Sequence, residues 1–343
     1  MPENKRQTEL DILRLLATLA VIMIHGGLNP LTDNLMIKYM YRGMHAAIVW
    51  CVPVFFMISG RFFLDPERDV SAKKILTVYL PHIIVPFLVW SGVYTAYGLI
   101  SGSYSHLSTF GVIAEFIHGP YHLWFLYSLA GLYLLTPILR KAAADGKTLA
   151  YFLIMFAAVN VVTQYLIYVP KIGWMISDFI ERTGLRAVTG YMGYFMLGYF
   201  LYSKKDNMSK KTETAIYVIG ILMLIATIAA ECFISEELRK TDFVKQYMKP
   251  NVILYSAAIY AFFVMKISKI HYNERTRKVF AVFTECGFGV YCIHAILNEF
   301  VPTPVIKSLP FITSLLRVAC LYALSLALIW LIRKIPFVGK KIT

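Results

Sequence analysis

The chain has 343 residues, of which 58% are hydrophobic and only 16% are charged, with a formal net charge of +14. A soluble globular domain has about 25% charged residues, so this composition excludes an ordinary soluble fold and predicts an all-α, polytopic integral membrane protein. The Lys and Arg residues fall in short clusters between apolar runs. Such clusters are typical of loops that face lipid headgroups, and no nucleic-acid partner is expected.

About ten transmembrane helices are predicted in chain order along a single domain, 1–343. The expected spans are 10–28, 41–64, 75–100, 121–140, 148–168, 187–203, 212–233, 250–269, 279–299 and 311–334. With both termini cytoplasmic, Lys and Arg are about twice as numerous in the inner segments as in the outer ones. The polar interruption 101–120 is compatible with a re-entrant or interfacial element.

Arg14 and His25 lie inside the first predicted span. Ionisable side chains inside a span are costly, so each indicates a functional site by default. On a helix that rises 1.5 Å per residue they lie roughly 16 Å apart, about half the hydrocarbon thickness. This arrangement suits a reaction whose two substrates arrive from opposite sides. Asp11, three residues before Arg14, can pair with it, and snorkelling to the headgroups is the alternative role for Arg14.

Five of the eight histidines fall near the predicted outer face: His25, His45, His118, His122 and His294. A neutral imidazole can take a proton from an attacking hydroxyl in acyl transfer, so His25, which lies within a span, is the predicted general base. The candidates for an acceptor site at this face are His122, Trp124, Glu115 and His294. For interfacial histidines, hydrogen bonding to headgroups or loop carbonyls is the alternative. No G-x-S-x-G elbow is present.

Near the predicted inner face, Arg14, Arg61, Lys73 and Lys74 form a candidate anion site. Guanidinium and ammonium groups bind phosphate strongly, although ordinary positive-inside flanking explains Lys73 and Lys74 equally well. There is no glycine-rich phosphate loop. The five cysteines form no C-x-x-C pair, so neither a metal site nor a disulfide is expected.

Five motifs, in order, resemble those of the membrane-bound acyltransferase-3 family. Arg14 and His25, with Asp11, are similar to its first-helix R-x10-H signature. The segment 53–60 resembles its second-helix motif, and 121–126 resembles its H-L-W-F-L motif. The segments 193–200 and 289–294 resemble later landmarks. The resemblance covers nearly the whole chain and is greatest to short, stand-alone members that O-acetylate surface polysaccharides.

The resemblance implies transfer of an acyl group from cytoplasmic acyl-coenzyme A to a hydroxyl of a cell-surface or lipid-linked glycan. Acetyl is the default acyl group and succinyl the alternative. His25 would be the base, with Arg14 and its neighbour Asp11 completing the catalytic set and Arg14 helping to bind the donor or to stabilise charge. Acyl-coenzyme A would be a co-substrate, with no bound cofactor or metal.

The resemblance further implies a multi-pass protein of a bacterial inner membrane whose partners are lipids, the donor and the glycan. An oligomer or an envelope-biosynthesis complex is compatible with it. One departure concerns the donor site: some members have R-x-x-R at the start of the third helix, where this chain has Lys74-Ile-Leu-Thr77. The cationic character is kept but the arginine pair is not.

Two other functions compete with the enzyme. A transporter or exporter of surface glycans or small amino acids would show mid-membrane carboxylates and matching broken helices in two halves. Pro53, Pro81 and Pro86 interrupt two early spans, but no matching pair stands out in the second half. A structural subunit of a polysaccharide complex would not need Arg14 and His25 at all.

Overall fold

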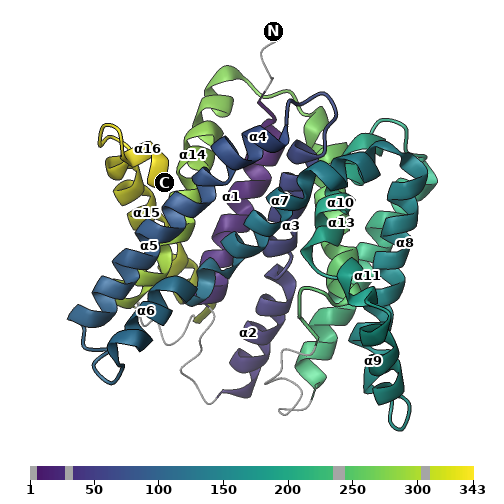
Figure 1. Cartoon of the computed structure of the whole chain (residues 1–343), viewed down its shortest axis with the longest axis horizontal. Helices are drawn as coiled ribbons and strands as arrows, with labels where there is room; N and C mark the ends of the chain where they lie inside the picture. The colour runs from purple at the N-terminus through teal and green to yellow at the C-terminus, as the bar shows by residue number, and fades with distance from the viewer. Residues whose placement is uncertain (1–5, 28–33, 235–243, 303–309) are drawn as a thin grey trace. The chain divides into compact units, whose positions relative to one another are not determined.

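A computed structural model describes residues 6–27, 34–234, 244–302 and 310–343, and Figure 1 shows their helices in chain order. No strand occurs among these residues. Within them, nine helical segments are long and apolar enough to cross a membrane: Thr8–Gly27, Leu35–Phe63, Ala72–Ile100, Tyr121–Ala144, Gly146–Tyr168, Lys210–Phe233, Pro250–Lys269, Glu274–Phe300 and Phe311–Ile332. The predicted all-α, multi-span fold is therefore confirmed, whereas the cytoplasmic location of both termini stays a prediction.

The helices of the first half follow the predicted spans, with breaks inside several of them. They are α1 (Thr8–Ile22), the π-helical turn η1 (Met23–Gly27), α2 (Leu35–Ile48), α3 (Cys51–Phe63), α4 (Ala72–Lys74), the π-helical turn η2 (Ile75–Tyr79), α5 (Pro81–Ile100), α6 (Thr109–His118), the 3-10 turn η3 (Tyr121–Leu123), α7 (Trp124–Ala144) and α8 (Gly146–Gln164). The interruption at 101–120 contains α6, a short apolar helix.

The described part of the second half contains two short α-helices that the sequence did not predict, α9 and α16. The elements are η4 (Leu166–Tyr168), α9 (Gly173–Arg182), η5 (Leu185–Val188), α10 (Tyr191–Lys204), α11 (Lys210–Phe233), α13 (Pro250–Met265), η6 (Ile267–Lys269), α14 (Glu274–Phe300), α15 (Pro310–Ile332) and α16 (Gly339–Ile342). The predicted span 187–203 corresponds to α10, whose 14 residues give a helix shorter than the hydrocarbon core.

The chain divides into two compact units, each built from separated stretches. Unit 1 comprises Met1–Ile24, Leu28–Arg68 and Ile138–Ala281, and unit 2 comprises His25–Gly27, Asp69–Pro137 and Val282–Thr343. Unit 1 contains α1 to α3 and α8 to α13. Unit 2 contains α4 to α6, most of α7 and α14, and the helices α15 and α16. The single domain expected from the sequence stays a prediction.

In unit 1, glycines bring α3 and α10 into close contact. A Cβ atom on Gly60 would lie 1.8 Å from the carbonyl oxygen of Phe195, and one on Gly198 would lie 2.2 Å from that of Met57. Only glycine allows two backbones to approach this closely, which is a common way to pack helices in membranes. The motifs 53–60 and 193–200 therefore form one helix–helix interface.

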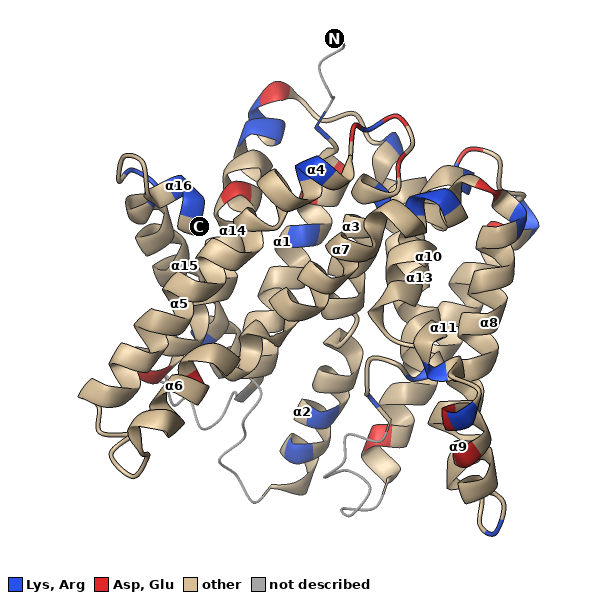
Figure 2. Ribbon diagram, in the orientation of Figure 1, with Lys and Arg blue, Asp and Glu red and all other residues tan. Residues whose placement is uncertain are grey.

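In unit 2, hydrogen bonds from side chains to backbone carbonyls connect α5, α14, α15 and α16. Trp90 on α5 donates its indole N–H to the carbonyl of Ile342 (2.8 Å), and Tyr94 donates its hydroxyl to that of Cys292 (3.0 Å). Arg333 donates to the carbonyl of Glu285 at 2.8 Å. Figure 2 shows Lys and Arg concentrated near helix ends and connections, while α5 has no charged residue along its length. Such a helix suits the bilayer core.

Candidate active site

Three histidines from distant parts of the sequence meet in unit 2. His25 comes from η1, His122 from η3 and His294 from α14. The ring centroids of His25 and His294 lie 5.1 Å apart, as do those of His122 and His294, and those of His25 and His122 lie 6.3 Å apart. The sequence placed all three near one face of the membrane, and the structure joins them in one cluster.

The three imidazoles differ in burial and in hydrogen bonding. His294 is fully buried and His122 is 2% exposed, whereas His25 is partly exposed. His25 Nδ1 lies 2.8 Å from His294 Nε2, and His294 Nδ1 lies 2.6 Å from the carbonyl oxygen of Tyr291. His122 Nε2 lies 3.3 Å from the carbonyl oxygen of Cys292. The imidazoles thus bond one another and the backbone, and the described residues contain no group of His, Cys, Asp and Glu suited to a metal ion.

Aromatic rings surround the histidine cluster. Tyr121 packs edge-on against His25, with 5.3 Å between ring centroids, and Tyr94 packs edge-on against His122 at the same distance. Tyr291 donates its hydroxyl to the carbonyl of His122. Tyr121 is 66% exposed, so the cluster has an open side lined by a phenol ring. The site therefore has aromatic rings around it and basic imidazoles at its centre.

Local backbone features place His25 and His122. His25 lies in a π-helical turn, a widened turn that is frequent at functional sites. Asn298 on α14 donates from Nδ2 to the carbonyl of His25 at 3.4 Å, and a Cβ on Gly26 would lie 2.6 Å from Asn298 Oδ1. Gly119, with φ of 67°, ends α6, and a Cβ there would lie 2.7 Å from the Phe87 ring. Glycine at 119 thus lets the chain turn directly into Tyr121 and His122.

Unit 1 contains a cluster of arginines around one aromatic ring. The guanidinium carbons of Arg14, Arg61 and Arg68 lie 5.1, 5.6 and 4.4 Å from the centroid of Phe62. Arg61 also stacks on Tyr202, at 3.4 Å from its centroid. Cations over ring faces are attracted to them, more strongly where water is excluded. We call Arg14, Arg61, Arg68 and Phe62 the arginine cluster.

Two aspartates hold the arginine cluster in place. Asp11, which is 3% exposed, pairs with Arg14 at 3.4 Å, as its spacing predicts, and with Arg6 at 2.6 Å. Asp65 pairs with Arg61 at 2.5 Å. The loop after α3 is fixed by Arg140, whose guanidinium donates to the carbonyls of Phe63, Asp65 and Arg68 at 2.8, 2.8 and 2.9 Å. Arg140 therefore positions the loop that carries Arg68.

Several predicted site residues are not members of these clusters. Lys73 and Lys74 are exposed on α4 in unit 2, where Lys74 pairs with Asp69. Glu115 lies on α6, and no interaction within the described part of the chain links it to the imidazoles. Trp124 lies beside Phe125, with 6.4 Å between ring centroids, and Phe125 in turn packs on Tyr291 at 6.0 Å. Trp124 is thus at the edge of the histidine cluster.

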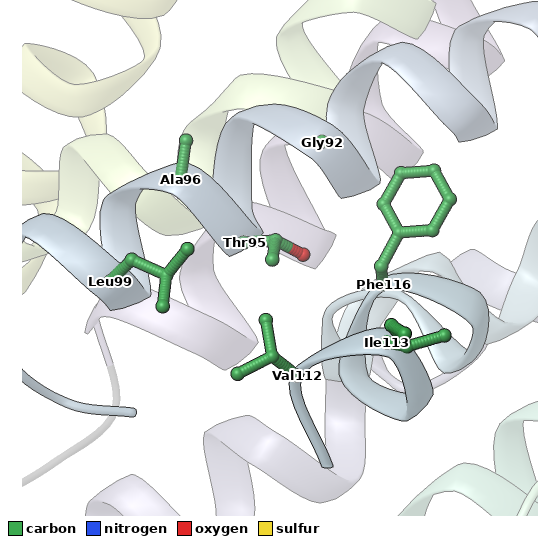
Figure 3. Close-up of a pocket in the computed structure, with 7 residues that line it drawn as sticks. All are labelled: Gly92, Thr95, Ala96, Leu99, Val112, Ile113 and Phe116. Carbon is green, nitrogen blue, oxygen red and sulfur yellow. The ribbon is translucent and has the colours of Figure 1, made fainter. Parts of the chain in front are cut away.

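Unit 2 contains an apolar groove with a volume of about 400 Å³, and Figure 3 shows the side chains that line it. It runs between α5 and α6 and is lined by Gly92, Thr95, Ala96, Leu99, Val112, Ile113 and Phe116. No lining residue is titratable. The groove therefore has no group for acid–base chemistry.

Comparison with known protein families supplies the identity. A family model described as an acyltransferase domain, acyltransferase-3, matches residues 7–334. This chain belongs to the acyltransferase-3 family. The predicted family is thus confirmed, and the chain is a multi-pass membrane acyltransferase. Neither the curated proteins nor the solved structures include a match to it.

Some residues that form or support the two clusters of this acyltransferase were not predicted from the sequence. Phe62 follows the predicted Arg61 directly and Arg68 lies in the loop after α3, yet their convergence with Arg14 depends on how α1 packs against α3. The adjacency of Phe62 to Arg61 was an available signal. Asn298 lies four positions after His294, on the same face of α14, so its place near the histidines could have been inferred. Arg140 gave no such signal, because it resembles ordinary positive flanking of a span.

Proposed function

We propose that this acyltransferase transfers an acyl group, acetyl by default, from cytoplasmic acyl-coenzyme A to a hydroxyl of a cell-surface or lipid-linked glycan in a bacterial inner membrane. His25 is the general base of the reaction. The observation that carries this proposal is the hydrogen bonding of the two nitrogens of the His25 ring. Its Nδ1 is bonded to His294, and its Nε2 makes no hydrogen bond within the described part of the chain.

The proposed reaction is a direct acyl transfer. His25 Nε2 takes the proton of the acceptor hydroxyl as its oxygen attacks the thioester carbonyl. The new C–O bond forms, the C–S bond breaks, and the thiolate of coenzyme A receives the proton from His25. A base with one engaged and one open nitrogen can perform both proton transfers without rotating its ring.

The arginine cluster supports a donor with phosphate groups. Guanidinium groups form paired, directional hydrogen bonds to phosphate, and three of them gather on the Phe62 ring. Arg14 also belongs to the helical segment Thr8–Gly27 that contains His25. In the proposal, this segment links donor binding at the arginines to chemistry at His25. Lys73 and Lys74 remain candidates for weaker donor contacts.

The histidine cluster offers polar and aromatic groups for a sugar. His122 Nδ1 is buried and has no hydrogen-bond partner among the described residues, so it is a candidate to accept a bond from an acceptor hydroxyl. Tyr121 and Trp124 provide ring faces on which a sugar can stack. Glu115 on α6 is a more distant candidate, since no interaction within the described part of the chain links it to the imidazoles.

The test is acylation of the native glycan in membranes that carry each variant, with radiolabelled acetyl-coenzyme A as the donor. General-base catalysis contributes about 10²–10⁴-fold, so His25→Ala should lower transfer by at least the smaller factor. The control is His106→Ala, since His106 is exposed in the 101–108 turn and its replacement should leave transfer unchanged. Near wild-type transfer by a folded His25→Ala protein would reject the catalytic role and favour the transporter.

A further inference from the structure

We infer that His294 is a positioning residue that fixes the ring proton of His25 on Nδ1 and so keeps Nε2 free to act as the base. This inference rests on the proposed function. It also gives His294 a different role from acceptor binding, because both of its ring nitrogens are already engaged, one by His25 and one by the Tyr291 carbonyl.

The first step is the proton on His294 Nδ1. This nitrogen lies 2.6 Å from the carbonyl oxygen of Tyr291, and a carbonyl oxygen can only accept a hydrogen bond. Nδ1 of His294 therefore carries a hydrogen and donates it. Both residues lie on α14, three positions apart, so the helix itself holds this contact in place.

The second step concerns the other nitrogen of His294. A second ring proton on Nε2 would make His294 a cation, fully enclosed beside two other imidazoles. No ion pair of His294 with a carboxylate occurs among the described residues, and burying an unpaired charge is strongly unfavourable. Nε2 of His294 is therefore unprotonated and accepts a hydrogen bond.

The third step sets the proton on His25. Its Nδ1 lies 2.8 Å from His294 Nε2, so Nδ1 must be the donor. The two ring planes differ by only 9°, and the centroid separation of 5.1 Å matches this N···N contact plus the two ring radii. The rings therefore meet edge to edge in nearly one plane, as a hydrogen bond between imidazoles requires. A neutral His25 then has its lone pair on Nε2.

The hydrogen bond between His25 Nδ1 and His294 Nε2 also stabilises His25 during the reaction. When Nε2 takes the proton of the hydroxyl, His25 becomes an imidazolium, and its Nδ1–H still donates to His294. Hydrogen bonds from a charged donor are roughly twice as strong as neutral ones. His294 thus holds the ring in the productive orientation and stabilises the charge formed in the transition state. Without it, the proton of His25 could occupy either nitrogen.

Amide substitutions at position 294 provide the test. His294→Gln places an amide oxygen where Nε2 of the imidazole lies, so it can still accept from His25 Nδ1. His294→Asn has the same amide chemistry but is one methylene too short. Transfer from acetyl-coenzyme A should stay within about tenfold of wild type for the Gln variant, the size of one neutral hydrogen bond. It should fall by about 100-fold for the Asn variant.

The decrease should be in kcat, with the KM for acetyl-coenzyme A unchanged, because His294 acts through His25 and not on the donor. Equal activity of the Gln and Asn variants, or a loss confined to KM, would overturn the inference. The Gln and Asn proteins should have the same melting temperature in detergent, which separates positioning from folding.

The His25→Ala variant, assayed alongside, distinguishes the two proposals. If His25→Ala retains wild-type transfer, the proposed function fails, whereas loss of transfer in His25→Ala with no loss in His294→Asn overturns this inference alone.

Discussion

At the scale of single residues, Arg14 combines an ion pair and a contact with an aromatic ring on one guanidinium. It pairs with Asp11 and lies over the Phe62 ring, and 30% of its side chain is exposed. An anchor that only snorkels to the headgroups does not need a buried carboxylate partner or a shared aromatic ring. In the proposed function, these contacts hold the guanidinium in the orientation in which it binds an anion.

Arg14→Ala is expected to weaken acetyl-coenzyme A binding by about tenfold to a hundredfold, since a charged hydrogen bond contributes about 1.5–3 kcal/mol. Asp11 keeps its bond to Arg6 in this variant, so its carboxylate is not left unpaired. Binding can be measured by titration calorimetry on detergent-solubilised protein. Lys73→Ala and Lys74→Ala are the matched comparisons and should lose less. An unchanged affinity in folded Arg14→Ala would leave Arg14 as a membrane anchor.

The sequence was most informative where a polar residue interrupts an apolar run. Arg14 and His25 could be identified because ionisable groups are costly inside a span, and Asp11 followed from helical spacing. The direct bond between His25 and His294 could not be predicted, because it joins two helices separated by most of the chain. The same is true of the Phe62 ring shared by three arginines, which depends on tertiary packing.

At the scale of elements, long apolar runs were located correctly because a spanning helix needs about 20 apolar residues. The departures are short elements. α9 has only 10 residues, too few to cross the bilayer, and it lies between the predicted spans 148–168 and 187–203. Ile172 at its N-cap and four apolar residues within it, Met175, Ile176, Phe179 and Ile180, do follow helical spacing, although Trp174 does not. The π-helical turn at His25 has no signature of this kind in the sequence.

The contact between α3 and α10 can be tested with glycine substitutions. Gly60→Ala adds a methyl group 1.8 Å from the Phe195 carbonyl oxygen, which is backbone and cannot rotate away. The helices must separate, and overpacking of this kind destabilises proteins by about 1–3 kcal/mol. A fall in the melting temperature in detergent is therefore expected.

The control for Gly60→Ala is Gly131→Ala on α7. A Cβ at Gly131 meets nothing within 4 Å, and alanine is favoured over glycine inside a helix by about 0.5–1 kcal/mol. Gly131→Ala should therefore be neutral or stabilising. Equal melting temperatures for the two variants would show that α3 and α10 are not packed as closely as described.

At the scale of the whole molecule, the proposed function requires that donor and acceptor approach from opposite sides of the membrane. This follows from the spacing of Arg14 and His25 on one helical segment, Thr8–Gly27. It also requires a fixed orientation, which the distribution of Lys and Arg predicts through the positive-inside rule. The family match and the apolar helices identify a multi-pass membrane acyltransferase, but they do not fix its direction in the bilayer.

The orientation can be measured with reporter fusions. Fusions after Lys141, at the end of α7, and after Lys211, at the start of α11, should report a cytoplasmic location. A reporter inserted at 105–108, before α6, should report an external one. These sites lie at the ends of long helices or in an exposed turn, so insertion should leave the packing of each unit intact. The opposite location at two of the three sites would place His25 on the cytoplasmic side. The arginines could then no longer bind a cytoplasmic donor, and the two-sided mechanism would have to be abandoned.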